Sequence, residues 1–410
     1  MRILLLTLYF DPDLAANSVI MTGLAEELAR LGHQVTVVAA FPHYDTNRIW
    51  EDYRGSLVRR EQRGELCIYR VYLYVPHHKD RILGRVLNYV SFNFFSTVVG
   101  LISGAHDVVL APSPPLTIGL SAYVISRLRR IAYVYNVQDI YPDVAIRLGV
   151  LTNSKAIAFF NALERFVYGK AAAVSVISEG FRRNLLAKGV LSEKVCIIPN
   201  FVDPGFVRVL PRHNRFSHEQ CLDDHFVVLF AGNVGLSQGL EFVLDAAYLL
   251  ADKPDILFLI VGNGAAKAGL VKQAEQMPFP NVRFLPFQPQ ERVPELYAAS
   301  DLCLVPLRQG ITQDSVPSKV YTIMAAAKPL VASVDDESDT SQFLRETGCG
   351  LLVPPEEPEA LAEAILALYQ DRSLGQAMGF KGRTRVEQEF TPQAAARKYA
   401  ALLEQVVIAQ

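Results

Sequence analysis

The chain has few cysteines and almost no net charge, and nothing in it is typical of a fibrous or disordered protein. Its five cysteines lie far apart and form no C-x-x-C pair, which argues against a disulfide framework, a zinc cluster and a redox motif. Half of the residues are hydrophobic, with only 25 glycines and 23 prolines, so collagen-like repeats and disorder are excluded. The apolar start is followed by Asp11 and Asp13 before any cleavage-like site, so it predicts a first strand and not a secretory signal.

The length of 410 residues predicts two domains of roughly 200 residues each. The net charge of −2 conceals an asymmetry: residues 1–200 carry 22 Lys/Arg and 16 Asp/Glu, whereas residues 201–410 carry 18 and 26. A basic first half indicates either an anionic partner or a solvated face that happens to be basic, and the pattern favours neither. We expect no nucleic-acid partner, because no nucleic-acid module or basic-aromatic run accompanies the charge.

Short apolar runs rich in β-branched residues alternate with amphipathic helical stretches in both halves, which is typical of βαβ units. The sequence therefore predicts the α/β class, with two doubly wound parallel sheets facing a cleft. We place the domains at 1–203 and 204–390, with 204–224 as linker and lead-in and a helix in 391–410 that packs back on the first domain. Strands are expected at 3–8, 35–39, 107–111, 133–137, 173–177, 227–231, 257–261, 282–285, 302–305, 330–334 and 350–353. Helices are expected at 18–31, 239–251, 265–276, 291–299, 317–327, 358–370 and 392–407.

The loops after these strands are the expected place for a site, because ligands of open parallel sheets bind outside the carboxyl ends of the strands. Nine segments at or near these positions follow one another in order: LYFDPD (8–13), LARLGHQVTVV (28–38), VQDIYPD (137–143), IIPNFVD (197–203), FAGNVGLSQGLEFVLDAA (230–247), LIVGNG (259–264), VRFLPF (282–287), ELYAASDLCLVPL (295–307) and SVPSKVYTIMAAAKPLVAS (315–333). Together they resemble glycosyltransferase family 4 in the two-domain GT-B architecture, over essentially the whole chain. The similarity is greatest to the bacterial subgroup that builds O-antigen, capsule or colanic acid.

The resemblance implies a nucleotide-sugar donor on the second domain, flanked in the family by two Glu residues eight positions apart. Asp314 and Thr322 stand at those positions here. The family commonly has Arg and Lys on the donor diphosphate, where this chain has Asn233 and Gln238. Two positive charges of the expected phosphate clamp are therefore missing.

We expect Lys319 to replace them, because it follows Val316, Pro317 and Ser318 at the start of a helix, where backbone N–H groups already favour phosphate. A solvated helix lysine is the alternative. Ser318 is the expected N-cap, and its hydroxyl is alternatively a candidate phosphate contact. Arg308 is a second candidate clamp or an exposed structural arginine.

Glycines in the same loops would let the backbone approach the donor closely, as at Gly232 and Gly235, although ordinary turns use glycine too. Gly262 is a further candidate donor contact. It opens a partial dinucleotide fingerprint whose third glycine is replaced by Lys267, so an NAD site is not expected. The segment ending at Phe287 resembles the one that holds the base in relatives, but a buried strand has the same pattern.

On the acceptor side, relatives often have a His-Asp pair beside the transferred sugar, and the match here is Gln138-Asp139. Gln138 can bond a sugar hydroxyl but cannot act as a base near neutral pH. Asp139 and Asp143 are candidate acceptor ligands, and Asp139 is equally a candidate turn cap. Asn17 and His43 lie in neighbouring loops, where a histidine is more often polar surface than a ligand.

Asp11-x-Asp13 has the spacing of a metal motif from another transferase fold, but the GT-B resemblance implies transfer without a metal or cofactor.

An uncharged stretch at 86–102 follows the basic residues His77, His78, Lys79, Arg81 and Arg85. It is marginal for a membrane span, and its alternatives are a core helix or a helix at the membrane interface. With the basic first half, it favours peripheral association with the inner membrane surface, where a lipid-linked acceptor would be reached.

The expected function is retaining, metal-independent transfer of a sugar from a nucleotide diphosphate to a glycan acceptor carried by a polyprenyl lipid, in the cytoplasm. Asp314, Lys319 and Asp139 are the expected catalytic residues. Two alternatives stay open: a nucleotide-sugar 2-epimerase of the same fold, and a catalytically silent nucleotide-sugar-binding subunit.

Overall fold

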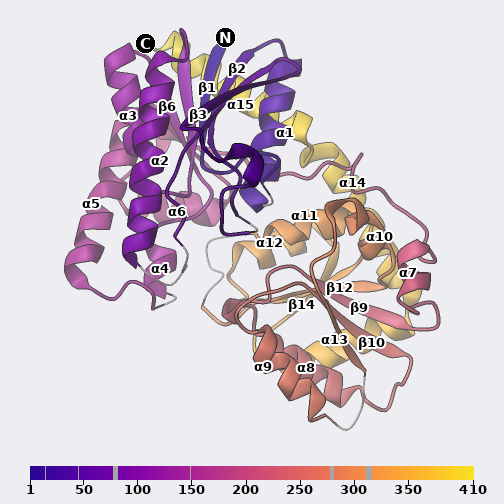
Figure 1. Cartoon of the computed structure of the whole chain (residues 1–410). Helices are drawn as coiled ribbons and strands as arrows, with labels where there is room; N and C mark the ends of the chain where they lie inside the picture. Colours follow the sequence, from indigo (N-terminus) through magenta and orange to yellow (C-terminus); the bar gives the residue numbers. More distant parts are fainter. Residues whose placement is uncertain (14, 45, 77–81, 148, 278–280, 311–315) are drawn as a thin grey trace. The chain divides into compact units, whose positions relative to one another are not determined.

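The computed structural model describes residues 1–410 except 14, 45, 77–81, 148, 278–280 and 311–315. The chain divides into two compact units (Figure 1): unit 1 comprises Met1–Pro199 and Pro392–Gln410, and unit 2 comprises Asn200–Thr391. Each unit is built on its own parallel sheet with helices on both faces. The expected class, α/β with two doubly wound sheets, is confirmed.

Unit 1 has an eight-stranded sheet in the order β3-β4-β2-β1-β5-β6-β7-β8. All neighbours pair in parallel except β3 and β4. Its central strands are buried on both faces, which is why their sequences are continuous apolar runs. The strands are β1 (Arg2–Thr7), β2 (Gln34–Ala40), β3 (Val58–Arg63), β4 (Leu66–Val71), β5 (Val108–Pro112), β6 (Ala132–Val137), β7 (Ala173–Val176) and β8 (Val195–Ile197).

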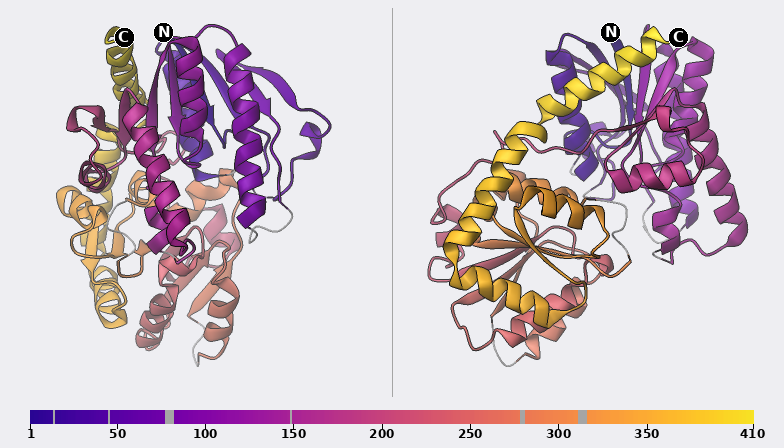
Figure 2. Two further views of the ribbon diagram at one scale, coloured as in Figure 1. Left: turned by 90° about the vertical axis from the view of Figure 1, so that its left-hand side faces the viewer. Right: turned by 180° about the vertical axis from the view of Figure 1, so that it is seen from behind.

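The helices of unit 1 form two layers. On one face α1 packs against the last helix of the chain, α15, and on the other α2 packs against α3 and α3 against α5 (Figures 1 and 2). Thus the chain's final segment completes the layer that its first helix begins. The helices are α1 (Ala16–Arg30), α2 (Ile82–Ile102), α3 (Ile118–Arg129), α4 (Asp143–Arg147), α5 (Ser154–Lys170), α6 (Glu179–Ala187) and α15 (Pro392–Ile408).

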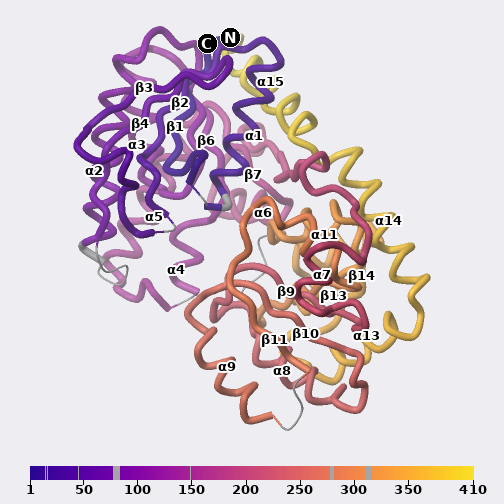
Figure 3. Tube along the Cα trace, turned by 45° about the vertical axis from the view of Figure 1, so that its right-hand side comes forward, coloured from indigo at the N-terminus to yellow at the C-terminus, as the bar shows by residue number. Residues whose placement is uncertain are grey.

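The sheet of unit 2 has six parallel strands in the order β11-β10-β9-β12-β13-β14. Helices α8 and α13 pack together on one of its faces, and α11 and α14 pack together on the other; Figure 3 follows this path as a trace. The strands are β9 (Phe226–Ala231), β10 (Ile256–Val261), β11 (Val282–Leu285), β12 (Leu302–Pro306), β13 (Leu330–Ser333) and β14 (Gly350–Val353). The helices are α7 (Arg215–Glu219), α8 (Leu240–Leu249), α9 (Lys267–Glu275), α10 (Val293–Ala298), α11 (Ser318–Ala325), α12 (Asp339–Thr347), α13 (Pro358–Gln370) and α14 (Arg372–Glu389).

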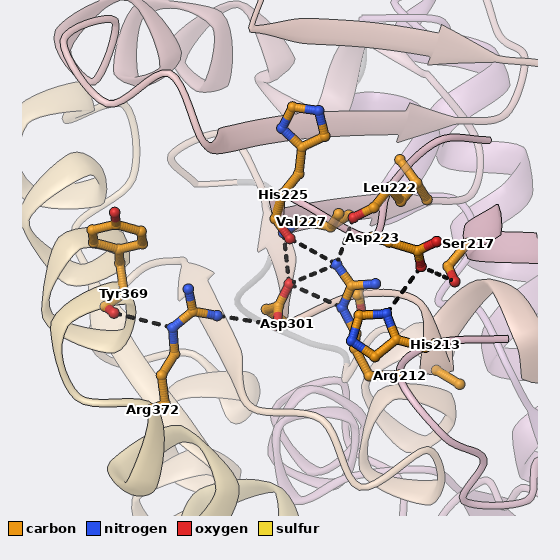
Figure 4. Close-up of polar contacts among 12 residues, drawn as sticks. Arg212, His213, Ser217, Leu222, Asp223, His225, Val227, Asp301, Tyr369 and Arg372 are labelled. Atoms are coloured by element: carbon orange, nitrogen blue, oxygen red, sulfur yellow. Dashed lines mark hydrogen bonds and ion pairs between the residues drawn. The ribbon is translucent and has the colours of Figure 1, made fainter.

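The segment 204–224, interpreted above as a linker, is part of the fold of unit 2. Phe216 and Leu222 are completely buried in its core. Arg212 donates from Nε to Oδ2 of Asp301 at 3.1 Å, and Asp301 also accepts the backbone N–H of Val227 at 2.7 Å (Figure 4). These bonds fasten the segment to the amino-terminal ends of β9 and β12, so its polar composition reflects ion pairing and not a flexible connection.

Candidate active site

The loops that follow β9 and β10 interlock through glycine at the carboxyl edge of the unit 2 sheet. A Cβ at Gly262, whose φ is +148°, would lie 1.8 Å from the backbone oxygen of Gly232. A Cβ at Gly264 would lie 2.2 Å from the backbone oxygen of Val234, and Val234 N–H donates to Asn263 O at 2.9 Å. Gly262 is therefore required for contact between the two loops, and its contact with a donor stays a prediction.

Lys319 is one of the cations that the structure brings to this edge. Its Nζ donates to Oε1 of Gln238 at 2.7 Å and lies 4.0 Å from the centroid of the Phe230 ring. A Cβ at Gly232 would be 3.6 Å from the same Nζ, so the missing side chain leaves the ammonium uncrowded from that side. Desolvation lowers the pKa of Lys319 to about 7, since no carboxylate among the described residues forms an ion pair with it.

The start of α11 differs in detail from expectation. Pro317 is the N-cap and makes no side-chain hydrogen bond, while Ser318 is the first helical residue, so the expected N-cap role of Ser318 is wrong. Val316 is buried in the core of unit 2. Thr322 lies one turn after Ser318 and is partly exposed. Asp314 lies outside the described residues.

Arg308 is held by unit 2 itself. Its guanidinium forms ion pairs with Glu241 and Glu356, and Nε donates to the backbone oxygen of Leu236 at 2.8 Å. Two carboxylates thus neutralise the candidate clamp, which favours the structural alternative. Asn233, in the same loop, is exposed.

Lys267 is a residue whose role the sequence did not reveal. Its Nζ donates to Gly262 O at 2.7 Å, Asn263 Oδ1 at 3.0 Å and Leu285 O at 3.1 Å. A single ammonium therefore ties the ends of β10 and β11 together, where the dinucleotide fingerprint has its third glycine. Phe287, just beyond, is exposed.

At the carboxyl edge of the unit 1 sheet, His43 belongs to a buried cluster and not to the polar surface. Its ring stacks on Tyr9 with centroids 5.5 Å apart, and Nδ1 lies 2.8 Å from Phe41 O. Asp13 accepts the backbone N–H groups of His43 at 3.3 Å and Tyr44 at 2.9 Å. This cluster joins the loop after β1 to the loop after β2.

Ser113, which the sequence analysis missed, joins the loops after β5 and β6. Its Oγ accepts the backbone N–H of Gln138 at 2.9 Å, and its backbone oxygen accepts Nδ2 of Asn17 at 3.4 Å. Gln138 Nε2 donates to Asn136 Oδ1 at 2.8 Å. Asp139 is exposed, and Oδ1 of Asn17 has no hydrogen-bond partner among the described residues. Asn17, Gln138 and Asp139 are thus gathered around Ser113.

Asp143 is engaged in an ion-pair network rather than presented to an acceptor. Lys188 Nζ lies 2.9 Å from Asp143 Oδ1 and 2.8 Å from Glu164 Oε1, and Asn184 Nδ2 donates to Asp143 Oδ2 at 3.0 Å. These residues come from α4, α5 and α6, with Lys188 as the residue that ends α6. The network fixes how the three helices meet, which favours a structural role for Asp143. Its contact with an acceptor stays a prediction.

Replacing Lys188 with methionine should destabilise unit 1, because the side chain of Glu164 is only 1% exposed and would lose its cation. Breaking a buried pair in this way costs about 3–5 kcal/mol. Urea denaturation would measure the loss, with Lys170→Met at the exposed end of α5 as the control, for which about 0.5 kcal/mol or less is expected. Equal midpoints for the two variants would contradict the structural role.

The two carboxylates of the D-x-D segment are directed to different partners. Asp11 forms an ion pair with Arg63, whereas Asp13 accepts the two backbone N–H groups named above. Within the described part of the chain, no group of three or more His, Cys, Asp or Glu side chains could hold a metal ion.

Family models match most of the chain. Residues 18–200 match the "Glycosyl transferase 4-like domain" and residues 225–371 match "Glycosyl transferases group 1". The "Putative colanic acid biosynthesis glycosyl transferase WcaI" of Escherichia coli K12 is 30% identical over 89% of this chain and 91% of that protein. The chain belongs to this glycosyltransferase family. A second relative is the "Probable glycosyltransferase WbjE" of Pseudomonas aeruginosa. It is 29% identical to this glycosyltransferase, and the match covers 79% of this chain and 81% of WbjE.

Solved structures agree on the fold. Anabaena Alr3699/HepE, in complex with UDP, superposes with a TM-score of 0.74 at 17% identity, covering 99% of this chain and all of that one. WaaG, a glycosyltransferase involved in lipopolysaccharide biosynthesis, gives 0.67 at 16% identity, covering 98% and 99%. The fold of the present glycosyltransferase is therefore GT-B, as its sequence motifs predict.

Proposed function

We propose that this glycosyltransferase moves a hexose, deoxyhexose or N-acetyl amino sugar from a nucleoside diphosphate to a glycan acceptor during the synthesis of a cell-surface polysaccharide. The name of the Escherichia coli relative refers to colanic acid, and a structure with the same fold was solved with UDP-glucose. We place the donor at the carboxyl edge of the unit 2 sheet, and acceptor contacts around Ser113 and the Tyr9–His43 cluster of unit 1.

The proposed donor site depends on the positive charge of Lys319. Asn233 and Gln238 bring no charge to the loop after β9, and Arg308 is neutralised by two glutamates. The Lys319 ammonium instead lies beside Gly232 at the start of α11, where the helix dipole adds positive potential. Gln238 holds it there through a neutral oxygen. Within the described part of the chain no carboxylate pairs with this ammonium, so a diphosphate would meet a positive charge.

The proposed transfer occurs with retention of configuration and needs no protein base or metal. The bond between the sugar C1 and the diphosphate oxygen breaks, and the acceptor oxygen bonds to C1 on the same face. The acceptor proton passes to the leaving phosphate oxygen, so charge and atoms balance. Lys319 stabilises the negative charge that develops on that oxygen. Asp314 and Asp139 are the proposed polar contacts to donor sugar and acceptor.

Donor binding should weaken as the pH rises through about 7, the pKa of Lys319 in the absence of donor. A bound diphosphate favours the protonated amine and raises its pKa, so the affinity is greatest below pH 7 and falls by up to about tenfold per pH unit above it. Titration calorimetry with a nucleotide sugar measures this cleanly, because its phosphodiesters do not titrate in this range. Lys319→Met should remove the pH dependence, and an unchanged profile in that variant would contradict the assignment.

A transfer assay separates this function from its alternatives. Native enzyme should form an acceptor-linked sugar and release the nucleoside diphosphate. Lys319→Ala should do so far more slowly, and Lys272→Ala on an exposed face of α9 should match the native enzyme. A changed nucleotide sugar without acceptor product would indicate a 2-epimerase. Donor binding without turnover would indicate a silent binding subunit.

A thermal-shift screen of nucleotide sugars would first find the donor, since a ligand of the folded state raises the melting temperature.

The proposed acceptor is carried by a polyprenyl lipid, so we place the enzyme peripherally on the inner face of the cell membrane. The basic first half of the chain supports this location. Of the basic residues before the apolar stretch, Arg85 is exposed and the others lie outside the described residues.

A further inference from the structure

Helix α2 reverses the usual amphipathic pattern. Residues 86–102 are all described, and the most exposed side chains among them are apolar: Val86, Leu87, Val90, Phe94, Val98 and Ile102 are 41–74% exposed. Asn88 and Ser96, in contrast, are buried and donate to Tyr74 O at 2.7 Å and Asn93 O at 3.2 Å. A surface helix of a soluble domain normally places its polar residues outward.

Helix α3 extends this apolar surface. Leu120, Val124 and Leu128 are exposed at four-residue spacing and so lie along one face of α3. The two helices run side by side in the same direction, because Ser121 Oγ donates to Asn93 O and the guanidinium of Arg129 donates to Leu101 O. The left view of Figure 2 looks onto this layer of unit 1.

The charged side chains exposed on the helices of this layer are of one sign. The exposed charged side chains of α2, α3 and α5, taken over residues 84–102, 118–129 and 154–170, are all basic. The one acid in these ranges, Glu164, is buried and bonded to Lys188. The basic residues are Arg85, Arg127, Arg129, Lys155, Arg165 and Lys170.

We propose that the outer face of α2 and α3 is a docking surface for an anionic phospholipid bilayer. Apolar side chains would enter the region between headgroups and acyl chains, and the basic residues would meet lipid phosphates. A membrane surface is where the proposed function would find its lipid-linked acceptor, so the role of this docking surface rests on that function. The evidence for the surface itself comes from the exposed residues of α2 and α3.

The helix lies on the bilayer and does not cross it. By length and composition alone Gly84–Ile102 could span a membrane. However, Phe92 and Val99 are buried in the core of unit 1, and a Cβ at Gly100 would be 2.6 Å from Ile125 Cδ1, so the inner face is packed against the rest of the unit. Spanning would remove this side of the core, whereas docking uses only side chains that are already exposed.

Vesicle flotation tests the surface directly. The full chain should float with vesicles containing phosphatidylglycerol and remain unbound with pure phosphatidylcholine or in high salt. Phe94→Gln with Ile102→Gln should lower the partition coefficient by about tenfold or more, because two large apolar groups are lost. Phe380→Gln, at a 70% exposed phenylalanine on α14, is the matched control and should bind as the native chain does. Unchanged binding of the double variant would overturn the proposal.

Two further measurements distinguish membrane docking from dimer formation and from a failure of the proposed function. Size-exclusion chromatography of native and double-variant chains should show the same mass, since a native dimer that the variant dissolves would mean that a second copy covers this face. Transfer to a short, water-soluble acceptor should be equal in both chains. If that activity is missing from the native chain while flotation succeeds, the proposed function fails and the docking surface stands.

Discussion

Replacing Lys319 with alanine should lower kcat for sugar transfer by about 100- to 1000-fold, the usual effect of removing one group that stabilises developing negative charge. The large effect is expected because Asn233 and Gln238 in the loop after β9 are uncharged, and Arg308 already pairs with Glu241. Steady-state kinetics with the donor found by thermal shift would measure it. The fold should tolerate the change, because alanine loses one hydrogen bond to Gln238 and the contact with the Phe230 ring but breaks no ion pair among the described residues.

Two controls sharpen this prediction. Lys319→Arg keeps the charge and should retain more activity than the alanine variant, although its planar group cannot reproduce the contact with Gln238. Lys272→Ala removes a lysine of the same unit from an exposed position and should have native kinetics. A Lys319→Ala enzyme within threefold of native kcat would mean that another group neutralises the leaving diphosphate.

Replacing Gly262 with alanine should destabilise unit 2 by about 3–5 kcal/mol, because the new Cβ would lie 1.8 Å from a backbone oxygen and φ is +148°. The backbone oxygen belongs to Gly232, which cannot move without displacing the loop after β9. The melting temperature should fall by about 10 °C. Donor binding should weaken at the same time, since this loop lies beside Lys319.

Gly269→Ala is the matched control. Gly269 lies within α9 with open space around its missing Cβ, so alanine there should leave stability unchanged or raise it by up to about 1 kcal/mol. Calorimetry would measure the melting temperatures of the Gly262→Ala and Gly269→Ala variants. Similar melting temperatures for the two would show that the glycine contact between the loops is not required.

The sequence predicted the parallel strands of both sheets well, because buried parallel strands are continuous apolar runs with clear limits. It did not predict the hairpin of β3 and β4. Strand β3 has the sequence VRREQR and is largely exposed at the edge of the sheet, so no apolar periodicity marks it. Strand β8, only three residues long, and helix α14, whose sequence has little apolar periodicity, were missed for related reasons.

The site was harder to predict than the fold. Motif order located the carboxyl-edge loops, and it singled out Lys319 and the Ser113 neighbours Gln138 and Asn17. It could not show that Arg308 and Asp143 are occupied by ion pairs, since their partners come from other elements. Ser113 and Lys267 carried no signal either, because a serine after a strand or a lysine at the start of a helix is common. Such roles depend on long-range contacts that a pattern along the chain does not contain.

A crystal structure with a bound nucleoside diphosphate would test the central claim most directly. We expect Lys319 Nζ to leave Gln238 and to lie about 2.8 Å from an oxygen of the terminal phosphate, next to Gly232. A diphosphate bound elsewhere in unit 2, with Lys319 still bonded to Gln238, would contradict it.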